Sequence, residues 1–443
     1  MIKPFKNLSN RNIKELTSIF NPENNPIQDT YKLPGVLYNN LIKDYNSPTM
    51  FEKHVIKLSN NTELYESLFY MALNFKKAAR EIADFMIKEP NIGKLDTMFF
   101  TLTYMYRQSI ELIMKALVFK LITDENKQKE FIKQISHDLE KIIEYIELQT
   151  NISHSESSLF IWLKNFLTNI SEFDRASDSF RYPFRIKRNS ALKTYKFEYV
   201  FKKRKDICIV KLVNKFELAF DIFHKAYTLS KEGFSSYMKN ESIHKKYSSE
   251  FLEEDGYYYA KSVIGHEYNQ SDMHLYVYSY RTSADYLFDL TLKNIRDNKE
   301  NLSDIYHLPI CYLYRNAIEL ALKDLCITSL PNTDALKAIY NKKHNLESMW
   351  NYIKQKYVLN LKYEIPEDHK MEIDKVLTLI HTGDPTSSKF RYPFDQSLNR
   401  YYPNDSRIHL GYDYYSLQYC LDIIEGLTDT TRDFIDNMET YHS

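Results

Sequence analysis

The stretch YRQSIELIMKALV (Tyr106–Val118) decides the predicted fold, because a close copy of it, YRNAIELALKDLC (Tyr314–Cys326), follows in the second half of the chain. In both stretches the apolar residues recur at steps of three and four, which is the period of a helix with one face in a protein core. Each stretch also carries Arg, Glu and Lys at steps of four, so the three charges lie along one ridge of the helix. These residues are Arg107, Glu111 and Lys115 in the first stretch and Arg315, Glu319 and Lys323 in the second.

Further motifs repeat in the same order at a nearly constant separation. Each with its copy, they are SHDLEKI (136–142) and KHNLESM (343–349), DRASDSFRYPF (174–184) and DPTSSKFRYPF (384–394), and LAFDIF (218–223) and QYCLDII (418–424). The first pair aligns His137 with His344, and the second pair ends in the same pentapeptide, FRYPF. Ordered repeats of this kind indicate two copies of one domain.

The predicted fold is all-α, with each copy of the repeat forming an up-and-down helical bundle. The expected boundaries are an N-terminal extension at 1–61, a first domain at 62–238, a linker at 239–267 and a second domain at 268–443. In the first copy only, the segment KTYKFEYVFKKRKDICIVKL at about 193–212 has two alternating β-like runs around a polar centre. This pattern predicts a small β-hairpin insertion.

Composition and charge further limit the classes of function that the sequence allows. Lys+Arg and Asp+Glu both total 59, so no net charge attracts the protein to nucleic acid or to a membrane surface, and any such binding must be local. The four cysteines are scattered, which disfavours a disulfide scaffold or a structural zinc site and fits a reducing compartment. Neither a signal peptide nor a membrane span is evident. We therefore expect a cytoplasmic protein with no membrane, no metal and no cofactor.

The repeated charges have two interpretations. Glu111 on a mostly apolar helix needs a cation nearby, so the row can be an ion-pair ladder that receives Arg181 from the first FRYPF. Alternatively, the row is the floor of a polar groove that holds phosphate or nucleotide. His137 and His344 likewise either belong to a helix start or serve as general acid–base groups.

In each FRYPF segment the proline has a predicted backbone role, whereas the role of the arginine side chain is left undecided. Pro183 and Pro393 fix the backbone after each arginine and stop any helix. Asp174 and Asp384, seven residues before the arginines, are expected to hold them in place.

A basic run in the first copy consists of Lys202, Lys203, Arg204 and Lys205. Aromatic residues alternate with charges just before it, at Tyr195, Phe197, Tyr199 and Phe201. Such a pattern can follow a phosphate backbone and stack bases. It equally fits aromatic residues packed on the bundle while lysines keep an edge strand exposed. The sequence leaves both interpretations open.

These motifs together resemble the HEPN superfamily: a helix reading A/S-x-E-L-x-x-K-A-L, a helix opening with H-D-L, a short R-Y-P segment and a final helix. The resemblance covers about 62–238 and 268–440. It implies that the two bundles pair within one chain as a pseudo-dimer, across a polar groove that binds RNA or nucleotide. Many members are metal-independent endoribonucleases of toxin–antitoxin, abortive-infection and CRISPR systems, in which a histidine activates the ribose 2′-hydroxyl and an arginine stabilises the phosphate.

This chain departs from the family pattern, because no arginine is followed by a histidine after four to six residues. The resemblance therefore implies a rearranged catalytic set of Arg181, His137, Arg391 and His344. The implied RNA- or nucleotide-binding residues are Arg107, Glu111, Lys115, Arg315, Glu319, Lys323, Tyr182, Tyr392, Lys202, Lys203, Arg204 and Lys205.

The expected function is RNA or nucleotide binding, with ribonuclease activity in phage defence or in a toxin–antitoxin system. A protein partner or antitoxin is expected, and a homo-oligomer stays open. The alternative is a non-catalytic interaction or nucleotide-sensing module whose Arg, Glu and His network is structural.

Overall fold

The computed structural model describes residues 52–58, 62–88, 91–150, 157–240, 242–256, 260–265, 273–300, 302–361, 365–402 and 406–442. Helices dominate these residues and the strands are few and short, which confirms the all-α prediction. Apart from 52–58, the predicted N-terminal extension lies outside the described residues.

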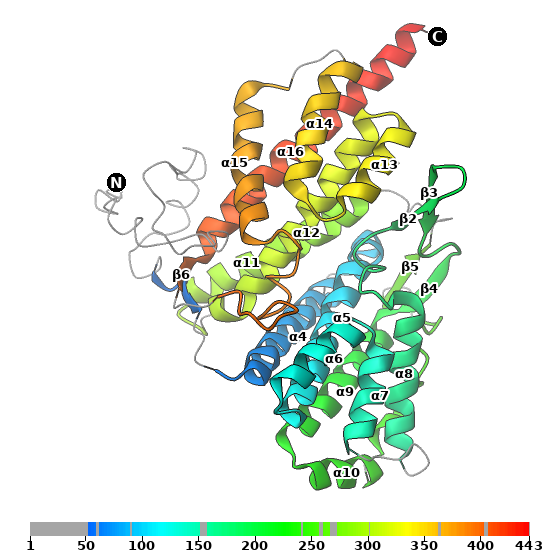
Figure 1. Ribbon diagram of the computed structural model, residues 1–443, viewed down its shortest axis with the longest axis vertical. Coiled ribbons are helices and arrows are strands. Elements are labelled where there is room, and N and C mark those ends of the chain that lie inside the picture. The colour runs from blue at the N-terminus through cyan, green and yellow to red at the C-terminus, as the bar shows by residue number, and fades with distance from the viewer. Residues whose placement is uncertain are drawn as a thin grey trace.

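Residues 62–240, called the first half here, form the lower part of Figure 1. Its helices are α4 (Leu64–Lys88), α5 (Ile92–Leu121), α6 (Glu125–Ile135), α7 (Leu139–Thr150), α8 (Ser158–Asp174), α9 (Ile209–Thr228) and α10 (Lys231–Asn240). Asn91 caps α5 by accepting a hydrogen bond from Lys94 N. α5 is buried on nearly every side because it packs against α4, α9 and α11.

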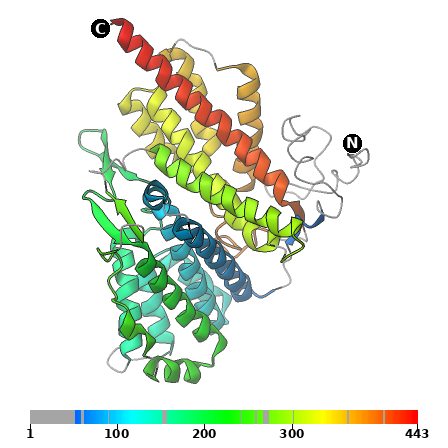
Figure 2. The same ribbon diagram turned by 180° about the vertical axis from the view of Figure 1, so that it is seen from behind.

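Residues 273–442, the second half, form the upper part of Figure 1. Its helices are α11 (Met273–Arg296), α12 (Ser303–Ser329), α13 (Asn332–Lys342), α14 (Leu346–Leu361), α15 (Glu367–Gly383) and α16 (Leu410–His442). The long helix α16 crosses the back of this half, as Figure 2 shows, and packs against α12 and α15. α12 is the counterpart of α5 and is equally buried.

The two halves meet along α4, α5, α11 and α12, which contact one another at the centre of the molecule. Tyr104 of α5 stacks on Tyr312 of α12, with ring centroids 4.9 Å apart. Both rings are buried, and Tyr280 packs edge-on against Tyr312. An aromatic core therefore joins the helices that carry the charged rows.

Three antiparallel strand pairs lie around the helices. They are β1 (Val55–Leu58) with β6 (Ser406–His409), β2 (Phe184–Asn189) with β3 (Thr194–Tyr199), and β4 (Lys205–Cys208) with β5 (Lys261–Ile264). In register, Val55 faces His409, Phe184 faces Tyr199 and Lys205 faces Ile264.

The prediction of a hairpin at about 193–212 is wrong in its position. The hairpin is β2–β3, which turns where Asn189 Oδ1 accepts hydrogen bonds from Ala191 N and Leu192 N. The basic run after β3 does not form the turn, because Phe201 is buried against Phe180 and continues the chain into the core. β4 pairs with β5 instead.

Much of the predicted linker packs on the first half. It contains the 3-10 helix η2 (Ile243–Lys246) and β5. Phe251 is buried, and Lys215 Nζ donates to Glu250 O at 2.6 Å. The described part of 239–267 therefore belongs to the packed fold of the first half.

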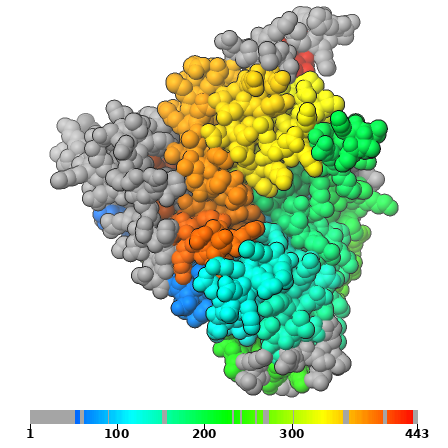
Figure 3. Space-filling view, viewed as in Figure 1, coloured from blue at the N-terminus to red at the C-terminus, as the bar shows by residue number. Residues whose placement is uncertain are grey.

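Each half extends the end of its FRYPF and the segment that follows onto the other half. The β2–β3 hairpin contacts α13, and the Tyr195 and Tyr340 rings lie 5.4 Å apart. In return, Phe394 stacks on Phe119 of α5 at 5.4 Å. In Figure 3 the green hairpin borders the yellow surface, and the orange segment borders the cyan surface. This exchange places residues of both halves at each candidate site.

Candidate functional site

The buried helix α5 carries the first charged row. Arg107 Nη1 lies 2.6 Å from Glu111 Oε2, and Lys115 Nζ lies 2.7 Å from Glu111 Oε1. The ion-pair ladder is thus confirmed, but the expected partner, Arg181, is wrong. The cations on Glu111 come from the same helix, because spacing of four residues already brings them within reach.

Helix α12 reproduces this geometry. Arg315 Nη1 lies 2.8 Å from Glu319 Oε2, and Lys323 Nζ lies 2.7 Å from Glu319 Oε1. The Glu319 side chain is almost completely buried. Burial raises its pKa, but the charges of Lys323, His344 and Arg315 outweigh burial and hold the pKa well below its ordinary value. Glu319 is therefore a carboxylate at neutral pH.

Asp174 and Asp384 hold a different arginine from the one predicted. Asp174 Oδ2 lies 2.9 Å from Arg107 Nε, while its Oδ1 accepts hydrogen bonds from Asp178 N and Ser179 N. Asp384 accepts matching backbone bonds and faces Arg315 Nε at 3.9 Å. One carboxylate oxygen closes the turn before FRYPF, so the other points to the helix rather than along the chain.

Each repeated histidine connects the charged helix of its own half, α5 or α12, to the FRYPF tyrosine of the other half. His344 Nδ1 lies 3.0 Å from Glu319 Oε1 and 3.1 Å from the hydroxyl of Tyr182, which donates to Glu319 Oε1 at 2.7 Å. The equivalent set contains His137, Glu111 and Tyr392, with corresponding distances of 2.9, 2.9 and 2.8 Å. Glutamate, histidine and tyrosine thus meet at two crossed sites.

Local backbone geometry sets the histidines in place. Ser136, the residue after α6, has a φ of 52°, and Lys343, the residue after α13, has a φ of 50°. A left-handed residue turns the chain sharply after a helix. The following histidine is therefore directed back toward the charged row, two residues before the next helix begins.

His344 has the protonation pattern of a general base. Glu319 raises its pKa, but burial and the charges of Arg181 and Lys323 outweigh that effect and leave the pKa below its ordinary value. Because Nδ1 faces a carboxylate and a hydroxyl that donates elsewhere, Nδ1 carries the hydrogen. Nε2 then has a free lone pair, and it forms no hydrogen bond with the residues that the structure describes. The side chain is 39% exposed.

The two FRYPF arginines lie in the interior rather than in a groove. Arg181 donates from Nε to Asn316 Oδ1 at 3.2 Å and from Nη2 to Ser387 Oγ at 3.1 Å. Arg391 donates from Nε to Ser387 O at 2.6 Å and from Nη1 to the Tyr104 hydroxyl at 3.4 Å. Both are buried, and neither lines the cavities described below. Their predicted contact with a ligand therefore lacks a structural basis.

The carbonyl group of each FRYPF proline is hydrogen-bonded to the chain that follows it. The carbonyl of Pro183 accepts a hydrogen bond from Val200 N at 3.3 Å, and that of Pro393 accepts one from Tyr401 N at 3.1 Å. In both copies the chain after the proline returns to it, and the tyrosine before it is fixed.

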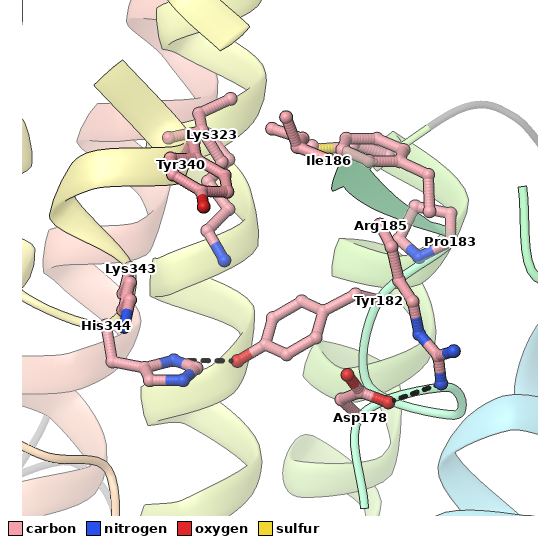
Figure 4. A pocket seen from close by; sticks show the side chains of 12 residues that line it. Asp178, Tyr182, Pro183, Arg185, Ile186, Lys323, Tyr340, Lys343 and His344 are labelled. Atoms are coloured by element: carbon pink, nitrogen blue, oxygen red, sulfur yellow. Dashed lines mark hydrogen bonds and ion pairs between the residues drawn. The ribbon is translucent and has the colours of Figure 1, made fainter. Parts of the chain in front are cut away.

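A cavity of about 310 Å³ opens beside His344. It is lined by Asp178, Tyr182, Pro183, Phe184, Arg185, Ile186, Met273, Lys323, Ile339, Tyr340, Lys343 and His344. In Figure 4, Lys323, Tyr340 and His344 form one wall, and Tyr182, Arg185 and Ile186 form the other. Lys323 Nζ lies 4.0 Å from the centre of the Tyr182 ring. Arg185 pairs with Asp178 at 2.9 Å.

The equivalent space beside His137 is much smaller, about 70 Å³. Lys115, His137 and Tyr392 line it, together with Asp395 and Tyr401 from the chain after the second FRYPF. The two sites therefore share their central groups and differ at the rim.

The basic run after β3 lies outside both cavities. Lys202 lies 3.9 Å from Glu198, Arg204 lies 3.3 Å from Asp206, and Lys205 lies 2.9 Å from Glu254. Phe197 packs on Phe184, and Phe201 is buried. These contacts favour the packed-strand interpretation over stacking on bases.

A group of possible metal ligands that the sequence did not predict lies between α12 and α16. His307, Cys311 and Asp413 are buried, and their ligand atoms lie within 4.8 Å of one another. Burial lowers the pKa of the nearby Lys389 ammonium more than Asp384 and Asp413 raise it, so that pKa lies below its ordinary value. Within the group, His307 Nε2 lies 3.4 Å from Asp413 Oδ2.

Comparison with known proteins gives no relative: no family profile, curated protein or solved structure matches the chain. None of the helices in the described ranges is long and apolar enough to cross a membrane. The described cysteines are all buried and free.

Sequence reasoning missed the rim of the larger cavity. Arg185, Lys343 and Tyr340 line it, yet none was a candidate. The signal was present where the copies disagree: Arg185 follows the first FRYPF where Asp395 follows the second, and Lys343 precedes its histidine where Ser136 precedes the other.

Proposed function

We propose that this chain is a tandem HEPN-like protein that binds RNA or nucleotides beside His344 and cleaves RNA there without a metal ion. The observation that carries the proposal is the Glu319–His344 pair, because His344 lines a cavity that Lys323 also lines. The crossed contacts of Tyr182 and Tyr392 support the interpretation of two paired bundles.

In the proposed reaction, Nε2 of His344 takes the proton from a ribose 2′-hydroxyl, and the 2′-oxygen attacks the adjacent phosphorus. The bond from phosphorus to the 5′-oxygen breaks, and the leaving oxygen takes a proton from solvent. The products are a 2′,3′-cyclic phosphate and a 5′-hydroxyl end. Glu319 orients the ring and stabilises the imidazolium, as the carboxylate of a catalytic triad does. Lys323 stabilises the charge that develops on the phosphate oxygens.

The experiment incubates the purified chain with total RNA in EDTA and analyses the ends of any fragments. Cleavage to 2′,3′-cyclic phosphates is expected, and His344→Gln should slow it by about 10²- to 10⁴-fold, the usual contribution of a general base. His369→Gln on α15, outside the lining of both cavities, is the matched control. RNA that stays intact with the unmodified chain would refute the catalytic part.

The resemblance alone carries the expectation of phage defence or a toxin–antitoxin role, with an antitoxin as partner. A second candidate, a nucleotide-sensing module without catalysis, is favoured by the burial of Arg181 and Arg391. Binding without cleavage, seen as a nucleotide-dependent rise in melting temperature, would distinguish it.

A further inference from the structure

The two sites start from the same central groups. Each has a lysine, a carboxylate, a histidine and a tyrosine at nearly equal distances. Any difference in what they bind must come from the surrounding residues. These surrounding residues give the two sites a different shape, a different charge and a different apolar surface.

Shape separates them first. After the second FRYPF, Asp395 Oδ1 accepts hydrogen bonds from Ser397 N at 2.8 Å and Asn399 N at 2.9 Å, which folds 395–401 into a compact turn. Tyr401 and Asp395 of this turn line the smaller space. At about 70 Å³, this space has less than a quarter of the volume of the cavity beside His344.

After the first FRYPF the chain does not fold into a turn. Arg185 instead belongs to strand β2, which pairs with β3 and leads away toward α13. The cavity left beside His344, about 310 Å³, reaches the lower end of the range for small-molecule sites, about 300 Å³.

Charge separates them next. The larger cavity is lined by three cations, Arg185, Lys323 and Lys343, and by one carboxylate, Asp178. The smaller one has only Lys115 and the opposing Asp395 among its charged lining residues. Because Asp178 pairs with Arg185 and Glu319 pairs with Lys323, Lys343 supplies the positive charge in excess. This net positive charge favours phosphate oxygens, to which arginine and lysine donate strong hydrogen bonds.

The larger cavity also has an apolar side. Ile186, Ile339 and Tyr340 line it, and Tyr340 keeps 38% of its surface exposed. Inorganic phosphate alone would leave this side uncovered. A planar base stacks well on an exposed aromatic ring.

We propose that the two sites are unequal, and that only the one beside His344 binds ligand: a single nucleoside phosphate, either free or as one nucleotide of an RNA. Its phosphate contacts Lys323, Lys343 and Arg185, and its base lies against Tyr340 and Ile186. The His137 site stays closed and holds the fold. This inference rests on the proposed function, because it assigns the phosphate-bearing ligand to one site.

Isothermal titration with AMP, GMP, CMP and UMP tests the inference, with adenosine and inorganic phosphate as partial ligands. We expect one equivalent of at least one mononucleotide per chain, and binding at least tenfold tighter than that of either partial ligand. The double variant Arg185→Asp/Lys343→Ser, which copies the rim of the closed site, should weaken binding at least tenfold. The reciprocal variant Asp395→Arg/Ser136→Lys should leave the affinity of the open site unchanged.

Two equivalents of nucleotide, or full affinity in the Arg185→Asp/Lys343→Ser variant, would overturn the inference. An unchanged melting temperature of each variant without ligand shows that folding is intact. The single variant Arg185→Gln also tests the rim, because it too should weaken the binding of the mononucleotide. A short RNA competing with the mononucleotide distinguishes the two ligand sources. RNA cleavage that depends on His344, without any mononucleotide binding, would refute this inference and leave the proposed function standing. Mononucleotide binding at one site, without RNA binding or cleavage, would support this inference and refute the proposed cleavage of RNA.

Discussion

At the scale of single residues, Glu319 is the group on which the site depends. Its carboxylate accepts from Arg315, Lys323, Tyr182 and His344 inside a buried region. A buried carboxylate is tolerated only when its partners compensate its lost hydration. The same carboxylate both neutralises the interior cations and holds the histidine proton on Nδ1.

Glu319→Gln should therefore lower the free energy of unfolding strongly, by about 3–5 kcal/mol, because it leaves the buried cations uncompensated. Urea denaturation measures the change. Glu367→Gln is the control, since that side chain is 75% exposed and its pair with Lys370 is a surface contact. A change for Glu319→Gln as small as that of the control would show that the row is not under strong electrostatic constraint.

At the scale of elements, the packing of the segment after β3 explains why the hairpin lies at 184–199. Phe201 contacts Phe100, Phe173 and Phe180 in the core, which fixes the end of the hairpin on the first half. The chain there cannot turn back on itself, and β4 pairs with β5.

Phe201→Ala should lower the free energy of unfolding by about 3–5 kcal/mol, the usual effect of removing a buried aromatic ring. Leu192→Ala, in the β2–β3 turn and 70% exposed, should change it by less than about 0.5 kcal/mol. Thermal or urea unfolding of both variants compares them. Equal effects would contradict the role of Phe201 in fixing the end of the hairpin in the core.

The sequence predicts the helices and the charged rows well because those features are local. Arg315, Glu319 and Lys323 meet through helical spacing alone, wherever the helix lies. The tyrosine on Glu319 could not be predicted in the same way. Tyr182 comes from the other half, and identical FRYPF copies do not encode which helix each will contact. The open cavity was missed because it depends on where the chain goes after FRYPF, which is a tertiary property.

At the scale of the whole molecule, each half completes the interior of the other. Tyr182 donates to Glu319, Tyr392 donates to Glu111, and Arg181 bonds to Ser387 of the opposite half. Buried polar groups on both sides would lose their partners if the halves separated. The halves are thus expected to unfold together, so the protonation of interior groups acts on the stability of the entire chain.

The interior histidines make this stability depend on pH. Burial lowers the pKa of His307 to about 3 and lowers that of His54 well below its ordinary value of 6.5. The pKa values of His137 and His344 are also lowered. At these four positions the unfolded chain therefore binds more protons than the folded chain below pH 6.5, so these histidines should lower the free energy of unfolding as the pH falls from 6.5 toward 3. At pH 5.5 each strongly shifted histidine accounts for about 1.4 kcal/mol of the loss. Urea unfolding at pH 7.5, 6.5 and 5.5 measures the slope of the free energy of unfolding against pH. His307→Gln should reduce this slope by the equivalent of about one proton taken up on unfolding. Equal stability at pH 7.5 and 5.5 would contradict the burial of neutral histidines throughout the molecule.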